Sequence, residues 1–192
     1  MEPSKPLRDP KLVAILVVIF VLAGSAVFLI PNRSLPSPGA YENLYVGTLQ
    51  TQENLNAHVL PVPFVRQKPW YCSEASASMV LQYYGFNVTQ DDVNNAGFDR
   101  FETMLPFLQR YVNAEYGQLS VEDLEEQVNL GNPVIIRIMA GEYRHSVVVV
   151  GYDENYIYIH DPAIGPYLKA KPEVLLKVWR PTGYLSIVLS PR

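Results

Sequence analysis

The chain has 192 residues, of which 48% are apolar and 18% charged, and its formal net charge is -4 at pH 7. This composition excludes an intrinsically disordered chain, and without a run of basic residues nucleic acid is not expected as a partner. Cys72 is the only cysteine, so it forms no internal disulfide and is left for pairing between chains or for chemistry.

The first predicted element is a transmembrane helix over residues 12–30, which read LVAILVVIFVLAGSAVFLI and carry no charge. A helix of this length spans roughly 28 Å, close to the thickness of a bilayer core. The positive-inside rule places residues 1–11 in the cytoplasm and the rest of the chain outside it. A cleavable signal peptide is the alternative, but its apolar core is usually about 7–15 residues long. The basic residues before the apolar run are Lys5, Arg8 and Lys11.

An extracytoplasmic linker is expected over residues 31–57, with a short strand at residues 44–49. A continuous helix is prevented there by prolines and a glycine. The globular domain is expected over residues 58–192, a length that can bury one core without disulfides. The helix-breaking residues of the linker are Pro31, Pro36, Pro38 and Gly39.

Within the domain, helices are predicted first. Residues 58–65 are expected to be extended at a sheet edge, because they contain two prolines. Apolar spacing predicts a helix from Cys72 to Tyr84 that ends at Gly85. Three further helices are expected at residues 90–95 after a Thr89 cap, at 101–116 with a kink or break at Pro106, and at 121–130 after a Ser120 cap.

Strands follow the helices. Period-two and apolar patterns predict a strand at 133–140, a hairpin at 145–162, a short helix at 171–179 and a last strand at 184–190. Helices before an antiparallel sheet are typical of an α+β fold.

The single thiol lies at the start of a predicted helix. Unpaired N–H groups and the positive end of the helix dipole favour the thiolate of Cys72, which is the nucleophilic form. The simpler interpretation is a small buried apolar residue. A thiol nucleophile requires a base and a group that orients the base. The histidines available for this role are His58, His145 and His160.

Hairpin register favours His145 as the base. If residues 153–155 form the loop, with Asn155 in the left-handed conformation, then Asp161 faces Val147, one diagonal step from His145 on the same face of the sheet. The two side chains are then within reach of a hydrogen bond. A loop of another length would reverse this face.

The other candidates follow from position. Gln67 lies shortly before Cys72, and its amide can donate to the oxyanion of an acyl-transfer reaction together with the N–H of Cys72. His160 points to the opposite face from Asp161, so a core or surface role is expected for it, and the same holds for His58. No metal-ligand spacing is present, and no cofactor is expected.

Three segments resemble a known family. FVRQKPWYCSEASASMVLQYYG, RHSVVVVGYD and IHDPAIGPY are similar to papain-like cysteine peptidases of the bacteriocin-processing (double-glycine leader peptidase) type, and most of all to stand-alone relatives. The resemblance covers most of residues 58–190. It implies a papain-like α+β fold, with Cys72 as nucleophile, His145 as general base and acid, Asp161 as orienting residue and Gln67 as oxyanion donor.

The sequence departs from that family where Ser73 replaces the usual glycine after the nucleophile. Two alternatives therefore stay open: a catalytically inactive relative that binds peptides, and an acyl transferase. We expect a membrane-anchored peptidase outside the cytoplasm that acts on a peptide or protein. Double-glycine leader cleavage is not expected, because the sequence carries no exporter domains.

Overall fold

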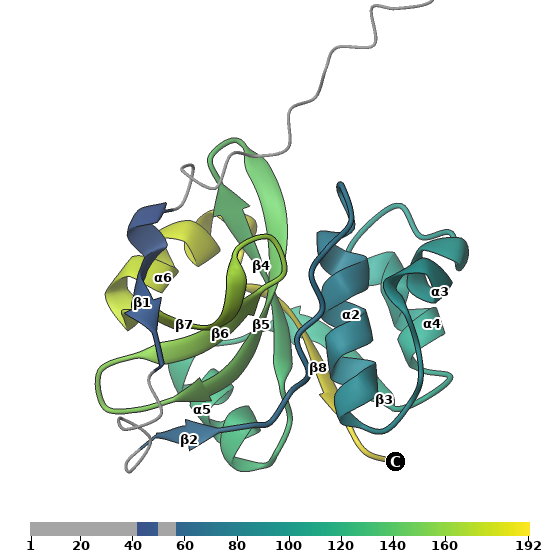
Figure 1. The fold of residues 1–192 in the computed structure, drawn as a ribbon, viewed down its shortest axis with the longest axis horizontal. Helices are drawn as coiled ribbons and strands as arrows, with labels where there is room; N and C mark the ends of the chain where they lie inside the picture. Colours follow the sequence, from purple (N-terminus) through teal and green to yellow (C-terminus); the bar gives the residue numbers. More distant parts are fainter. Residues whose placement is uncertain (1–41, 50–56) are drawn as a thin grey trace, which may run out of the picture. The chain divides into compact units, whose positions relative to one another are not determined.

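An antiparallel sheet of eight strands forms the centre of the structure, a computed structural model that describes residues 42–49 and 57–192 (Figure 1). The strands are β1 (Tyr45–Thr48), β2 (His58–Val59), β3 (Asn113–Gln118), β4 (Val134–Ala140), β5 (Tyr143–Tyr152), β6 (Ile157–Asp161), β7 (Gly165–Ala170) and β8 (Leu185–Ser190). They run in the order β1-β7-β6-β5-β4-β8-β3, and β2 pairs with β5.

The helices cover this sheet. They are α2 (Cys72–Tyr83), α3 (Gln90–Asn95), α4 (Leu105–Leu108), α5 (Val121–Asn129) and α6 (Pro172–Trp179), with short 3-10 turns η3 (Glu42–Leu44), η4 (Glu102–Met104) and η5 (Arg180–Thr182). Figure 1 shows α2, α3 and α4 together on one side, with α6 on the other side near β7. Helical and antiparallel elements in these positions confirm the predicted α+β class.

Small residues let α2 approach the sheet closely. The helix is buried on nearly every side from Ser73 to Leu81, and it packs against β5. Before it, residues 68–71 form a turn closed by a hydrogen bond of 3.0 Å from the Tyr71 N–H to the Lys68 carbonyl. Trp70 has φ +70 in this turn, a conformation that a bulky residue adopts only under strain. The turn fixes where Cys72 enters the helix.

The β5–β6 hairpin reaches the expected register by a different route. Its loop extends to Tyr156, because Tyr152 pairs with Ile157, but an irregularity between Val149 and Gly151 restores the pairing of Val148 with His160. The extra loop residue and the bulge cancel each other. The loop is held by the Asp153 carboxylate, which accepts from the N–H groups of residues 155 and 156. Asn155 does not adopt the left-handed conformation, so that prediction is wrong.

The long helix predicted over residues 101–116 is also wrong. The segment contains only η4 and α4 before it becomes β3, which pairs with β8 over six consecutive residues. Pro106 stands at the start of α4 rather than at a kink, since proline is tolerated in the first turn of a helix. Pairing with a strand far along the chain outweighs the local helical pattern.

Part of the predicted linker belongs to the sheet. The expected strand at 44–49 is present as β1, and it pairs with β7. The predicted anchor at residues 12–30 lies outside the described residues. Among the helices that are described, none has the length and apolar content to cross a bilayer.

We predict that Gly151→Ala lowers the free energy of unfolding by about 1–3 kcal/mol, because overpacking a closed site costs this much. A Cβ at Gly151 would lie 2.6 Å from the carbonyl oxygen of His58 on β2. Gly117→Ala is the matched control, because a Cβ there has nothing within 4 Å and should change stability by less than about 0.5 kcal/mol. Equal stabilities of the two variants in denaturant unfolding would contradict this account of β2.

Candidate active site

The structure brings the four residues singled out in the sequence close together, and three of them line one cleft. Cys72 is the first residue of α2, His145 lies near the start of β5, and Asp161 ends β6. Gln67 belongs to the loop before α2. The cleft has a volume of about 330 Å³, and its lining includes Gln67, Cys72 and His145 but not the buried Asp161.

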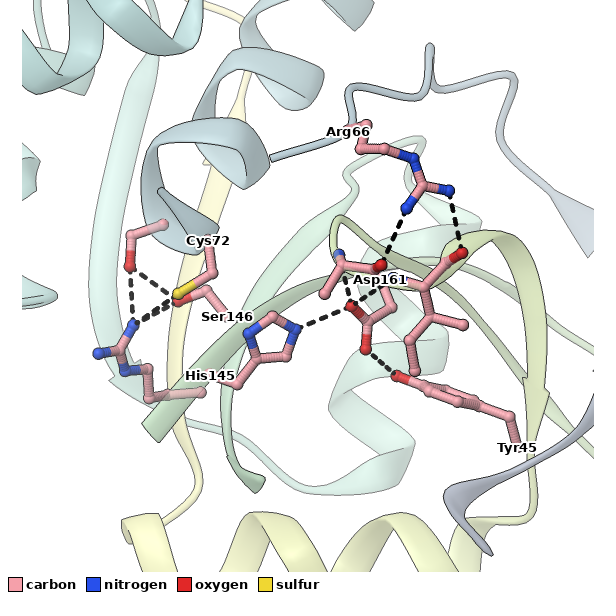
Figure 2. A network of polar contacts seen from close by, with 10 residues as sticks. Tyr45, Arg66, Cys72, His145, Ser146 and Asp161 are labelled. Carbon is pink, nitrogen blue, oxygen red and sulfur yellow. Dashed lines mark hydrogen bonds and ion pairs between the residues drawn. The ribbon is translucent and has the colours of Figure 1, made fainter. Parts of the chain in front are cut away.

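His145 is held by Asp161. The Nε2 atom of His145 lies 2.8 Å from the Oδ1 atom of Asp161, and both side chains are almost completely buried. Because a carboxylate only accepts hydrogen bonds, Nε2 carries the proton. Figure 2 shows that the other ring nitrogen, Nδ1, lies on the side of Cys72. The imidazole is therefore oriented with one nitrogen toward the carboxylate and one toward the thiol.

The electrostatics favour an ion pair between thiolate and imidazolium. Burial raises the pKa of Cys72, but the hydrogen bond and charge of His145, with the charge of Arg137, lower it to about 7. Burial lowers the pKa of His145. The charge and hydrogen bond of Asp161, followed by the hydrogen bond and charge of Cys72, raise this pKa to about 9. Between these two values the charged pair is the favoured state.

The start of α2 adds to this effect. Its N-cap is Tyr71, which makes no side-chain capping bond, whereas Thr89 and Ser120 cap α3 and α5 through reciprocal capping boxes. The N-cap side chain therefore does not compete for the first N–H groups of α2, although the Glu74 carboxylate accepts from its own N–H. The N–H groups at this end of the helix favour negative charge at Cys72.

Asp161 serves the loop as well as the histidine. Its Oδ1 atom also accepts from the N–H of Ala163 at 2.9 Å, and its Oδ2 atom accepts from the hydroxyl of Tyr45 at 3.0 Å. The carboxylate is thus fixed from three directions (Figure 2). The turn at Pro162 and the orientation of His145 depend on the same side chain and are not alternatives.

Gln67 is attached to that turn. Its N–H donates to the carbonyl of Pro162 at 3.0 Å, and Arg66 donates to the carbonyls of Ala163 and Ile164 at 2.9 and 3.2 Å. The side-chain oxygen of Gln67 is buried and has no hydrogen-bond partner within the described residues. This oxygen can accept a hydrogen bond from a molecule bound in the cleft, whereas an oxyanion would need the Nε2 donor of the same amide.

The other two histidines lie elsewhere. His160 is buried, with Nε2 2.9 Å from the carbonyl of Val62 and Nδ1 accepting from the N–H of Tyr167, which confirms the expected core role. His58 is exposed and stacks on Tyr152. Over residues 42–49 and 57–192, no group of three or more His, Cys, Asp or Glu side chains is arranged to hold a metal ion.

Two contributors to this site were not expected from the sequence. Tyr45 lies in the predicted linker, 116 residues before its partner Asp161, and no local pattern connects them. Arg137 lies beside the thiol, with Nη1 3.9 Å from the Sγ atom of Cys72. Its signal was present, because it is the only charged residue in the apolar strand VIIRIMA.

The chain belongs to the Peptidase C39-like family, which it matches over residues 59–187. Solved structures of other proteins share the papain-like α+β fold of this chain. A C39-like peptidase from Bacillus anthracis has a TM-score of 0.59 at 22% identity, covering 70% of this chain and 98% of that one. No curated protein sequence matches the chain.

Two further structures share the fold. A double-glycine motif protease domain from an AMS/PCAT transporter, solved with its leader peptide, has a TM-score of 0.58 at 24% identity and covers 70% of this chain and 94% of that one. The peptidase domain of Streptococcus ComA, a bifunctional ABC transporter of a quorum-sensing pathway, has a TM-score of 0.56 at 18% identity and covers 68% and 98%.

We predict that the rate of Cys72 alkylation by iodoacetamide rises with pH around a midpoint near 7, following the pKa of about 7. His145→Ala removes the hydrogen bond and the positive charge, so its midpoint should move up toward the ordinary thiol value of about 8.5. Stopped-flow alkylation from pH 5 to 10 measures both midpoints. A wild-type midpoint at the ordinary thiol value would exclude the ion pair.

Proposed function

We propose that the protein is a membrane-anchored cysteine peptidase that cleaves peptide bonds outside the cytoplasm. The observation that carries the proposal is the chain of contacts from Asp161 through His145 to Cys72, opening on one cleft. A thiol at a helix start, a base within reach and a carboxylate that orients the base are the parts that nucleophilic acyl transfer requires.

In the proposed reaction the Cys72 thiolate attacks the carbonyl carbon of the scissile peptide bond. A C–S bond forms, and the π electrons of the carbonyl move to its oxygen. The N–H of Cys72 and the amide of Gln67 are the donors available for this oxyanion. When the intermediate collapses, the C–N bond breaks and the proton on Nδ1 of His145 passes to the leaving amine.

Water then completes the reaction. His145, now neutral, takes a proton from a water molecule that attacks the thioester, and the C–S bond breaks to release the acid and restore the charged pair. Asp161 exchanges no proton in either half. Its role is to keep Nε2 protonated, so that Nδ1 faces the thiol.

A peptide substrate is supported by the related protease that was solved with a leader peptide. Two alternatives use the same cleft: peptide binding without cleavage, and acyl transfer to an amine instead of water. Position 73 carries serine where the resembled family has glycine, which favours peptide binding without cleavage. The ionised pair of Cys72 and His145 favours a reactive thiol instead. Products and binding separate the three possibilities.

The test uses the full-length chain in detergent with a peptide library, read by mass spectrometry. We expect cleavage by the wild type and none by Cys72→Ala. We expect Asp161→Asn to lower kcat by roughly 10²–10⁴-fold, because the negative charge that stabilises the His145 imidazolium is lost. The melting temperature should change little, since an amide can keep the bonds to Ala163 and Tyr45.

The result that would overturn the proposal is peptide binding by the wild type with no product. Acyl transfer would show itself as a product joined to an added amine. Full activity in Asp161→Asn would remove this carboxylate from the site and leave it a role in the turn alone.

The position of the peptidase domain outside the cytoplasm is also a proposal. It is supported by the uncharged residues 12–30 and the basic residues before them. We predict that protease added to intact cells or spheroplasts removes the domain. A domain that is protected until the membrane is lysed would reverse the orientation. A free domain in the culture medium would instead favour a cleaved signal peptide.

A further inference from the structure

Arg137 occupies an unusual position for a charged residue. It lies in β4, whose other residues are almost all apolar, and its side chain is half-buried. The guanidinium lies 5.6 Å from the ring centre of the buried Phe101. Its Nε atom is buried without a hydrogen-bond partner in the described part of the chain. A cation in such a place is usually paired with an anion.

No carboxylate provides that pairing. Within the described residues, the ion pairs are Lys68–Asp91 and His145–Asp161, and neither includes Arg137. The charge of Arg137 acts to lower the pKa of Glu74 on α2, but the Glu74 carboxylate lies beyond ion-pair distance of the guanidinium. The nearest group able to carry negative charge is the thiol of Cys72, whose Sγ atom is 3.9 Å from Nη1.

Two buried hydroxyls hold the guanidinium in this position. Nη1 lies 2.7 Å from the Oγ atoms of Ser73 and of Ser146, and these two hydroxyls are 2.9 Å apart. Ser146 follows His145 on β5, and Ser73 follows Cys72 on α2. The serine that departs from the glycine of the resembled family is therefore one of the two groups that fix Arg137 beside the thiol.

We propose that Arg137 is a second cation for the Cys72 thiolate, which it stabilises from the β4 side while His145 stabilises it from the β5 side. This role rests on the proposed function, in which Cys72 is the nucleophile. Arg137 transfers no proton, because a guanidinium stays charged at every relevant pH. It increases the fraction of thiolate and makes that fraction less dependent on the protonation of His145.

Other charged groups at the cleft do not replace it. Those that line the cleft near the thiol are Glu74, Asp99, Arg100 and Arg144. Asp99, Arg100 and Arg144 are exposed, so solvent and salt screen them. Burial raises the pKa of Glu74, and its charge would oppose the thiolate. Arg137 is the partly buried cation in contact with sulfur.

The experiment compares the pH dependence of Cys72 alkylation in Arg137→Gln, Arg137→Lys and Arg144→Met in the full-length protein. Loss of an opposite charge at this distance should raise the alkylation midpoint of Arg137→Gln by about one pH unit, which lowers the rate at pH 6.5 by roughly tenfold. Arg137→Lys keeps the charge and should stay closer to wild type. Arg144→Met removes an exposed arginine of the same cleft and should match wild type.

The proposal is overturned if Arg137→Gln has the wild-type midpoint, or if the Gln and Lys variants shift equally, since only a structural role predicts equal effects. Arg137→Met provides a second neutral side chain should the Gln variant fail to fold. Because alkylation requires no peptide, this outcome is separate from that of the cleavage experiment: a protein without peptidase activity can still show the shift.

Discussion

The hydrogen bond between His145 and Asp161 is the interaction on which the rest of the site depends. Both side chains are buried, with 2% and 0% of their surface exposed, so each would be costly to ionise alone. Together they keep a protonated imidazole in the interior at a pH where free histidine is neutral. That charge in turn stabilises the Cys72 thiolate. Without the carboxylate, burial would lower the pKa of His145, and Cys72 would lose the cation that His145 provides.

The fold provides this contact through parts that are distant in sequence. β5 supplies the histidine, β6 supplies the carboxylate, and β1 closes over the carboxylate through Tyr45. The loop before α2 is bonded to the turn after β6 through Arg66 and Gln67. The thiol, the amide and the carboxylate are therefore held by one connected set of hydrogen bonds rather than by independent elements.

Short sequence patterns correctly predicted the elements that are determined by interactions between neighbouring residues. Thr89 and Ser120 begin α3 and α5 as expected, because a capping box satisfies N–H groups within four residues. The prediction failed for residues 101–116, where pairing of β3 with β8 decides the structure. The strand β7 was not predicted from the sequence. The predicted hairpin register was correct because the extra loop residue and the bulge, neither of which was predicted, offset each other.

The candidate site shows the same division. Cys72, Gln67, His145 and Asp161 could be chosen from short patterns and family resemblance. The structure places the first three at one cleft, with the buried Asp161 bonded to His145. Tyr45 and the two serines beside Arg137 could not, because their roles arise from contacts between separate strands and α2. Arg137 itself was visible as an isolated charge in an apolar strand, which is a signal for a buried polar role.

The most direct test of the account is the protonation state of His145, measured by ¹⁵N NMR of the ring in full-length protein labelled at histidine. The account predicts an imidazolium at pH 8 that loses its proton near pH 9, with a lower midpoint in Cys72→Ala, because the negative thiolate is gone. A neutral His145 ring at pH 8, titrating near the ordinary histidine value of about 6.5, would contradict it.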